Sequence, residues 1–94
     1  MVGNILLEIP HIKLRQLITK RYCLSIEDTE LFDFVEDFLW DNYNIETDDI
    51  ELDNSETVVI CNYFFESDFD ISALIIALKE IDVQEIERIY KLNN

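Results

Sequence analysis

The chain has 94 residues, 49% of them hydrophobic and 12% aromatic, and a formal net charge of −14 at pH 7. This length fits one small domain with a modest core, and the apolar content argues against intrinsic disorder. With a single Gly, the chain cannot contain a glycine-rich phosphate loop. No apolar run approaches the roughly 20 residues of a transmembrane helix, and the N-terminus lacks a signal-peptide pattern. We expect one cytoplasmic domain spanning 1–94, with Cys23 and Cys61 as free thiols.

The N-terminal third predicts a short strand and a helix. Residues 4–9 carry apolar side chains at both odd and even positions, which favours a strand, with a helical turn as the alternative. Pro10 suits the first position of a helix, because its missing N–H is not needed there. Apolar residues then fall at helical spacing: Leu14, Leu17, Ile18 and Tyr22.

Residues 27–42 predict a second helix with two opposed faces. Ser25, Asp28 or Thr29 can cap its start. A broad apolar face is expected to enter the core: Leu31, Phe32, Phe34, Val35, Phe38 and Leu39. The opposite arc is acidic and contains the only tryptophan of the chain: Glu30, Asp33, Glu36, Asp37, Trp40 and Asp41.

The second half predicts a hairpin, a helix and a final strand. Residues 49–53 alternate Ile and Leu with acids, which indicates an edge strand, and 57–65 is typical of a central strand after a turn at 54–56. A helix is expected over 71–81. Residues 85–93 alternate and predict a strand, with a helix capped by Asp82 as the alternative.

The fold class expected from these elements is α+β. It has two N-terminal helices, a β-hairpin, a third helix and a C-terminal strand in a small antiparallel sheet.

The charge is distributed unevenly along the chain. Residues 22–78 contain sixteen acidic residues and no Lys or Arg, whereas residues 1–21 contain four of the seven basic residues. A stretch without positive side chains cannot form ion pairs within itself, so its carboxylates repel one another. A positively charged partner would offset this cost. We therefore predict a partner-binding surface on the second helix and the hairpin: Glu30, Asp33, Glu36, Asp37, Trp40, Asp41, Asp48, Asp49, Glu51 and Asp53.

Other kinds of site are disfavoured. His11 is the only histidine, and no nucleophile motif is present, so we expect no enzyme activity and no cofactor. The acids of 49–53 match the first ligand positions of an EF-hand loop, but Asn54 and Ile60 stand where its Gly and bidentate Glu belong, so no dedicated metal site is expected. Clustered bases for direct nucleic-acid or membrane binding are lacking.

The string SIEDTELFDF at 25–34 resembles the opening of the nuclease-colicin immunity proteins. That family consists of small acidic four-helix inhibitors of basic DNases. Its Tyr-Tyr-Pro signature is missing here, and the strand predicted at 57–65 has no counterpart in its fold. The resemblance therefore implies no common fold and no homology, and an acidic inhibitor of a basic nucleic-acid enzyme is the type of function that the charge suggests.

The function expected from the charge is stoichiometric inhibition. Carboxylates at a helical spacing of about 5–6 Å can mimic a nucleic-acid backbone and occupy the basic groove of a nuclease, a CRISPR effector or a DNA-binding regulator. Phage anti-CRISPR and anti-restriction proteins share this composition. Trp40 would anchor the contact, unless it folds onto the hairpin as core. The alternatives are an immunity protein or antitoxin against one basic nuclease toxin, and a structural subunit whose acids only solubilise it. We expect a monomer or a weak homodimer.

Overall fold

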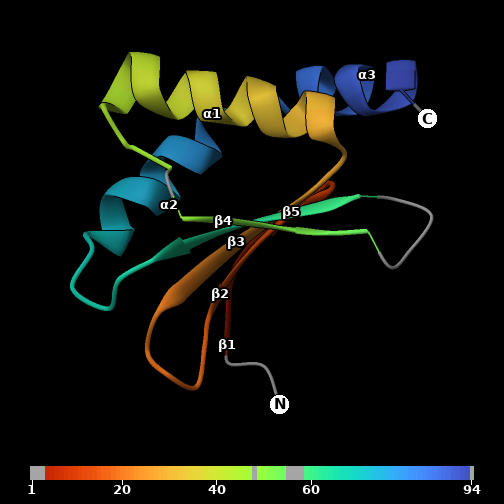
Figure 1. Ribbon diagram of the computed structural model, residues 1–94. Helices are drawn as coiled ribbons and strands as arrows, with labels where there is room; N and C mark the ends of the chain where they lie inside the picture. Colours follow the sequence, from red (N-terminus) through yellow and green to blue (C-terminus); the bar gives the residue numbers. More distant parts are fainter. Residues whose placement is uncertain (1–3, 48, 55–58, 94) are drawn as a thin grey trace.

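The structure is a computed structural model that describes residues 4–47, 49–54 and 59–93. Within these residues the elements in chain order are β1 (Asn4–Ile9), β2 (Ile12–Gln16), β3 (Tyr22–Glu27), α1 (Thr29–Tyr43), β4 (Ile50–Asp53), β5 (Ile60–Phe65), α2 (Ile71–Lys79) and α3 (Val83–Asn93). The strands form one antiparallel sheet in the order β1-β2-β3-β5-β4, and the helices lie together against one of its faces (Figure 1). The molecule is thus a two-layer α+β domain.

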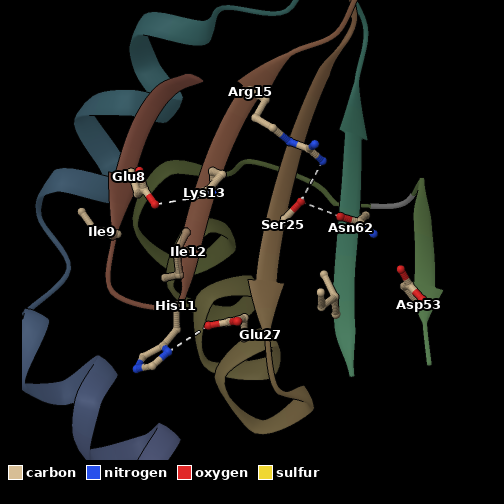
Figure 2. A pocket seen from close by; sticks show the side chains of 11 residues that line it. Glu8, Ile9, His11, Ile12, Lys13, Arg15, Ser25, Glu27, Asp53 and Asn62 are labelled. Atoms are coloured by element: carbon tan, nitrogen blue, oxygen red, sulfur yellow. Dashed lines mark hydrogen bonds and ion pairs between the residues drawn. The ribbon is translucent and has the colours of Figure 1, made fainter. Parts of the chain in front are cut away.

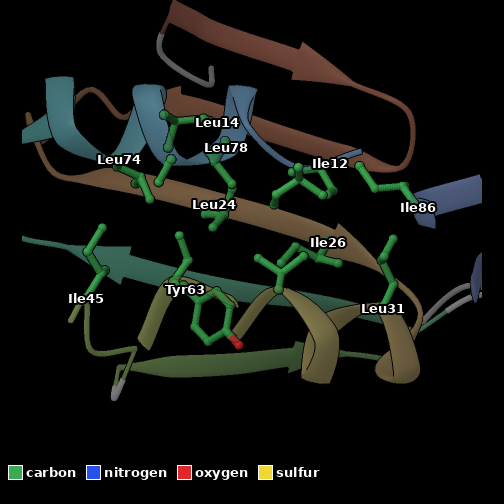
Figure 3. Close-up of a cluster of buried hydrophobic side chains, with 14 of the residues drawn as sticks. Ile12, Leu14, Leu24, Ile26, Leu31, Ile45, Tyr63, Leu74, Leu78 and Ile86 are labelled. Carbon is green, nitrogen blue, oxygen red and sulfur yellow. The ribbon is translucent and has the colours of Figure 1, made fainter. Parts of the chain in front are cut away.

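The core lies between the sheet and the helices (Figure 3). At the centre of the sheet Leu24 of β3 stands opposite Leu14 of β2 and Tyr63 of β5, and all three are fully buried. Each helix contributes fully buried side chains to the same cluster: Leu31, Val35 and Leu39 from α1, Leu74 and Leu78 from α2, and Ile86 from α3. Apolar burial on this single interface is the main stabilising term of the fold.

The N-terminal helix predicted from Pro10 is wrong, because the chain forms a three-stranded meander there. Ile12 and Leu14 face the core, while Lys13 and Arg15 point to the opposite face of the sheet. Pro10 lies in the turn between β1 and β2, where His11 adopts a positive φ of 64°. The apolar residues of this segment also satisfy a period of two, and sheet pairing decided between the two patterns.

The C-terminal strand predicted at 85–93 is also wrong, since these residues belong to α3. The Asp82 side chain accepts a hydrogen bond from the Gln84 N–H at 2.9 Å, so the alternative with Asp82 as the cap is correct. Ile86 enters the core and Ile89 packs against it one turn later, whereas Leu92 is 72% exposed. The alternation in 85–93 that predicted a strand was therefore fortuitous.

Four of the predicted elements are confirmed: the strand at 4–9, the helix of α1, the strand pair β4–β5 and the helix of α2. Asp28 caps α1, because its side chain accepts a hydrogen bond from the Leu31 N–H at 3.3 Å. α1 ends at Asn44 in the left-handed conformation. Of the turn predicted at 54–56, Ser55 and Glu56 lie outside the described residues.

The face of the sheet opposite the helices is open, and it is polar. Its central side chains include Arg15, Cys23, Ser25 and Asn62. Cys23 on this face and Cys61 on the covered face are both buried and both free, as predicted. In the described part of the chain no helix is long and apolar enough to cross a membrane.

Candidate protein-binding surface

The outer side of α1 is a continuous row of carboxylates, which we call the acidic face of α1. It consists of Glu30, Asp33, Glu36, Asp37 and Asp41, of which Glu36 is half-buried and the others are exposed. The periodicity that directs Leu31, Val35 and Leu39 into the core directs these acids outward. Within the described residues, none of the five carboxylates lies within ion-pair distance of a basic group. The repulsion expected from the sequence is therefore present on this face.

Trp40 lies among these acids and is 50% exposed. It is not part of the core, which settles the alternative in which it would fold onto the hairpin. The indole borders a depression of about 370 Å³, whose walls come from α1 and the segment that follows it: Glu36, Asp37, Trp40, Ile45, Glu46 and Thr47. A hydrogen bond from Thr47 Oγ1 to Glu36 Oε2 at 3.2 Å joins the two walls. The site thus combines an apolar ring with an acidic rim.

The structure separates the predicted hairpin acids from this face. By register, Glu51 stands opposite Asn62 and Asp53 opposite Ile60, so both side chains lie on the open face of the sheet, away from α1. Asp49 accepts a hydrogen bond from Arg21 at 2.6 Å, an ion pair between segments far apart in sequence. Asp48 lies outside the described residues. Of the ten predicted positions, those on α1 come together and those on β4 form a separate row.

Two buried side chains beneath the acidic face hold protons firmly. Burial raises the pKa of the Tyr63 hydroxyl, Thr47 opposes this shift, and the Glu36 carboxylate reinforces it. Tyr63 stacks on Phe32 with centroids 4.7 Å apart, and its hydroxyl lies near Thr47 without forming a well-aligned hydrogen bond to any described residue. Burial also raises the pKa of the Cys61 thiol, with a smaller contribution from Asp28. A buried, protonated thiol is a poor nucleophile, so Cys61 is a core residue.

A second cavity, of about 380 Å³, lies on the open face of the sheet (Figure 2). Arg15 Nη2 donates hydrogen bonds to Ser25 Oγ at 3.2 Å and to Cys23 Sγ at 3.4 Å, and Ser25 Oγ donates to Asn62 Oδ1. This cluster was not predicted, because Arg15 was expected to lie on a helix. The alternation of Lys13 and Arg15 with apolar neighbours was the signal that could have revealed it.

His11 lies at one end of this cavity and joins three elements. Its Nδ1 is 3.0 Å from Glu27 Oε1 on β3, and its Nε2 is 2.6 Å from Glu87 Oε1 on α3. Both ring nitrogens are therefore occupied, as befits a boundary residue that connects the β1–β2 turn to α3. Among the described residues, no group of three or more His, Cys, Asp or Glu side chains is arranged to hold a metal ion.

No family model, curated protein or solved structure matches this chain.

Proposed function

We propose that the protein binds a basic partner protein through the acidic face of α1, with Trp40 as the apolar anchor. The observation that supports this proposal is the combination of five carboxylates and a half-exposed indole on one helix, with no ion pair to these carboxylates within the described residues. Solubility alone would not require a large aromatic ring at the centre of the charge. A partner with Lys and Arg would relieve the repulsion and bury the ring.

The physical roles of the two components differ. The carboxylates speed the encounter with a positively charged surface and fix its register, an effect that salt weakens. The indole supplies contact area and can stack on an Arg side chain, while the surrounding acids form the polar rim. Such a site favours a partner whose apolar notch is flanked by basic residues.

A nucleic-acid-binding protein is the class of partner that this surface suits best. Its groove presents Lys and Arg at intervals that match phosphates, and carboxylates on successive turns of α1 repeat at about 5–6 Å, which is a similar scale. A protein that occupies this groove competes with nucleic acid and acts as a stoichiometric inhibitor. The candidate targets are a nuclease, a CRISPR effector or a DNA-binding regulator.

The experiment that tests this proposal is affinity capture from host lysate at about 50 mM and about 500 mM salt, followed by mass spectrometry. The double variant Asp33→Lys/Asp37→Lys removes the charge pattern. The control, Asp68→Lys/Glu80→Lys, makes the same change in net charge at exposed positions outside α1. We expect a nucleic-acid-binding protein to be retained at low salt by the native protein and the control, and lost by the α1 variant. The proposal fails if both variants retain the same proteins as the native chain.

A further inference from the structure

We propose that the partner contributes an extended basic strand, which adds to the outer edge of β4 as a sixth strand of the sheet. This inference rests on the proposed function and specifies how the partner docks. β4 is the last strand in the sheet order, beyond β5, and Figure 2 shows it as the outermost strand on that side. An edge strand presents backbone N–H and C=O groups that another chain can pair with.

The two edges of the sheet differ in how well they are protected. At β1 the register shifts between Ile5 and Leu7, and Pro10 follows the strand, so a bulge and a proline blunt that edge. β4 pairs with β5 in unbroken register from Ile50 to Asp53, and all four of its residues are exposed. The edge at β4 is therefore the one that can accept a strand.

The apolar side chains of β4 are left uncovered by the helices. Ile50 and Leu52 point to the same face as the core, yet they are 40% and 53% exposed. Their neighbours on β5, Tyr63 and Cys61, are fully buried on that face, so the helical layer ends between the two strands. Apolar residues of an added strand would cover Ile50 and Leu52 and continue the core outward.

The Trp40 depression and β4 are close along the chain. The segment that forms one wall of the depression, 45–47, precedes β4 by two residues in the chain, and Thr47 ties it to Glu36 of α1. A partner whose strand adds to β4 would extend from that edge to reach the acidic face of α1. Basic side chains on the flanks of this strand would reach the carboxylates of that face.

Charge decides between a foreign strand and a second copy of this chain. Because strand side chains alternate between faces, antiparallel pairing of two β4 strands would place Glu51 opposite Glu51 or opposite Asp53 of the other copy. Like charges directly opposite each other destabilise a sheet. A strand that alternates apolar residues with Lys or Arg instead meets Ile50 and Leu52 on one face and the acids on the other. The acids of β4 and of α1 would then contact one partner, although they lie on different sides of the sheet.

The test uses a synthetic peptide of about eight residues that alternates Lys and Val, a length typical of one strand. Its matched control is the same peptide with every backbone N–H methylated, which keeps the charges and side chains and removes the donors for pairing. Binding is followed at about 50 mM salt by emission from Trp40, the only tryptophan, and by amide NMR of the whole protein. We expect the plain peptide to shift the amide resonances of 50–53 and to protect these amides from hydrogen exchange. The methylated peptide should bind at least about tenfold more weakly.

Protein variants complete the experiment. Glu51→Lys, at an exposed edge position, should weaken binding of the plain peptide by about tenfold. Asp68→Lys makes the same charge change and should have little effect on this binding. Strand addition is overturned, and the proposed function stands, if both peptides bind equally and perturb only the amides of α1. It is also overturned if neither peptide binds while a basic protein is still captured through α1. If no basic ligand of either kind binds, the proposed function itself fails.

Discussion

The imidazole of His11 lies flat against the ring of Tyr90, with centroids 3.6 Å apart and planes 9° from parallel. The same ring contacts Glu27 and Glu87 through its two nitrogens. A single side chain in the β1–β2 turn thus connects this turn to β3 and α3.

Replacing His11 tests this connection. We expect His11→Asn to lower the free energy of unfolding by about 1–2 kcal/mol, because it removes the ring stack and a hydrogen bond. Asn tolerates the positive φ of this position, so the loss does not arise from the backbone. Urea unfolding measures the effect, with Lys13→Ala as a control that breaks only the exposed contact to Glu8 at 3.7 Å. Equal stability of the two variants would contradict a structural role for the ring.

Tyr63→Phe should leave the stability unchanged or raise it by about 1 kcal/mol, because the hydroxyl is buried without a well-aligned hydrogen bond to any described residue. The variant also has a pH signature. Burial raises the pKa of Tyr63 in the folded state above the ordinary value of 10.0, so the contribution of this group is fully present below pH 10 and is lost as pH rises above it. Urea unfolding between pH 8 and about 11 should show a smaller alkaline loss in Tyr63→Phe. An identical slope in both proteins would show that the hydroxyl is solvated.

Asp33→Asn/Asp37→Asn should stabilise the protein at low salt by about 0.2–0.5 kcal/mol, because the two carboxylates are one helical turn apart and repel each other. Asn and Asp have similar helix propensities, so the charge is the main change. Thermal unfolding at about 10 mM and about 500 mM NaCl measures the effect, which salt should abolish. Asp68→Asn serves as the control outside a helix. A destabilised double variant would mean that the acids contribute favourable contacts within the fold.

Trp40→Ala should weaken binding of the basic partner by at least tenfold, about 1.4 kcal/mol, while the unfolding midpoint in urea changes little. The half-exposed indole contributes area to a partner and little to the core. Ile76→Ala, on the exposed side of α2, is the matched control that should leave binding intact. Titration calorimetry with the captured partner gives both affinities. If the Trp40 and Ile76 variants bind alike, the indole is not the anchor.

The sequence predicted α1 well because one long amphipathic pattern admits a single interpretation. Its acids could face only outward once Leu31, Val35 and Leu39 faced inward. Residues 10–22 were different, since their apolar positions fit both a period of 3.6 and a period of two. Pairing with β1 and β3 selected the strand, and such non-local partners are not visible in a local pattern.

The candidate site was predictable only as far as α1 extends. Glu51 and Asp53 lie on the face of the sheet that the helices leave open. Tertiary packing determines which face the helices cover, and a local sequence pattern does not show it. The pairing of Arg21 with Asp49 likewise joins the basic N-terminal segment to the stretch without Lys or Arg, two segments that are far apart in sequence. A count of charges along the chain therefore overstated the extent of the uncompensated surface.

The strand order has a consequence for how the molecule folds. β1, β2 and β3 pair with their immediate neighbours in sequence, whereas β5 pairs with β3 across the whole of α1 and β4. Local pairing loses little loop entropy and can form early, while the β3–β5 pairing must close a long loop. Until α2 and α3 have been synthesised, only α1 can cover the apolar face of this meander. During synthesis the acids between β3 and β5 would then keep the exposed, incomplete sheets of different chains apart.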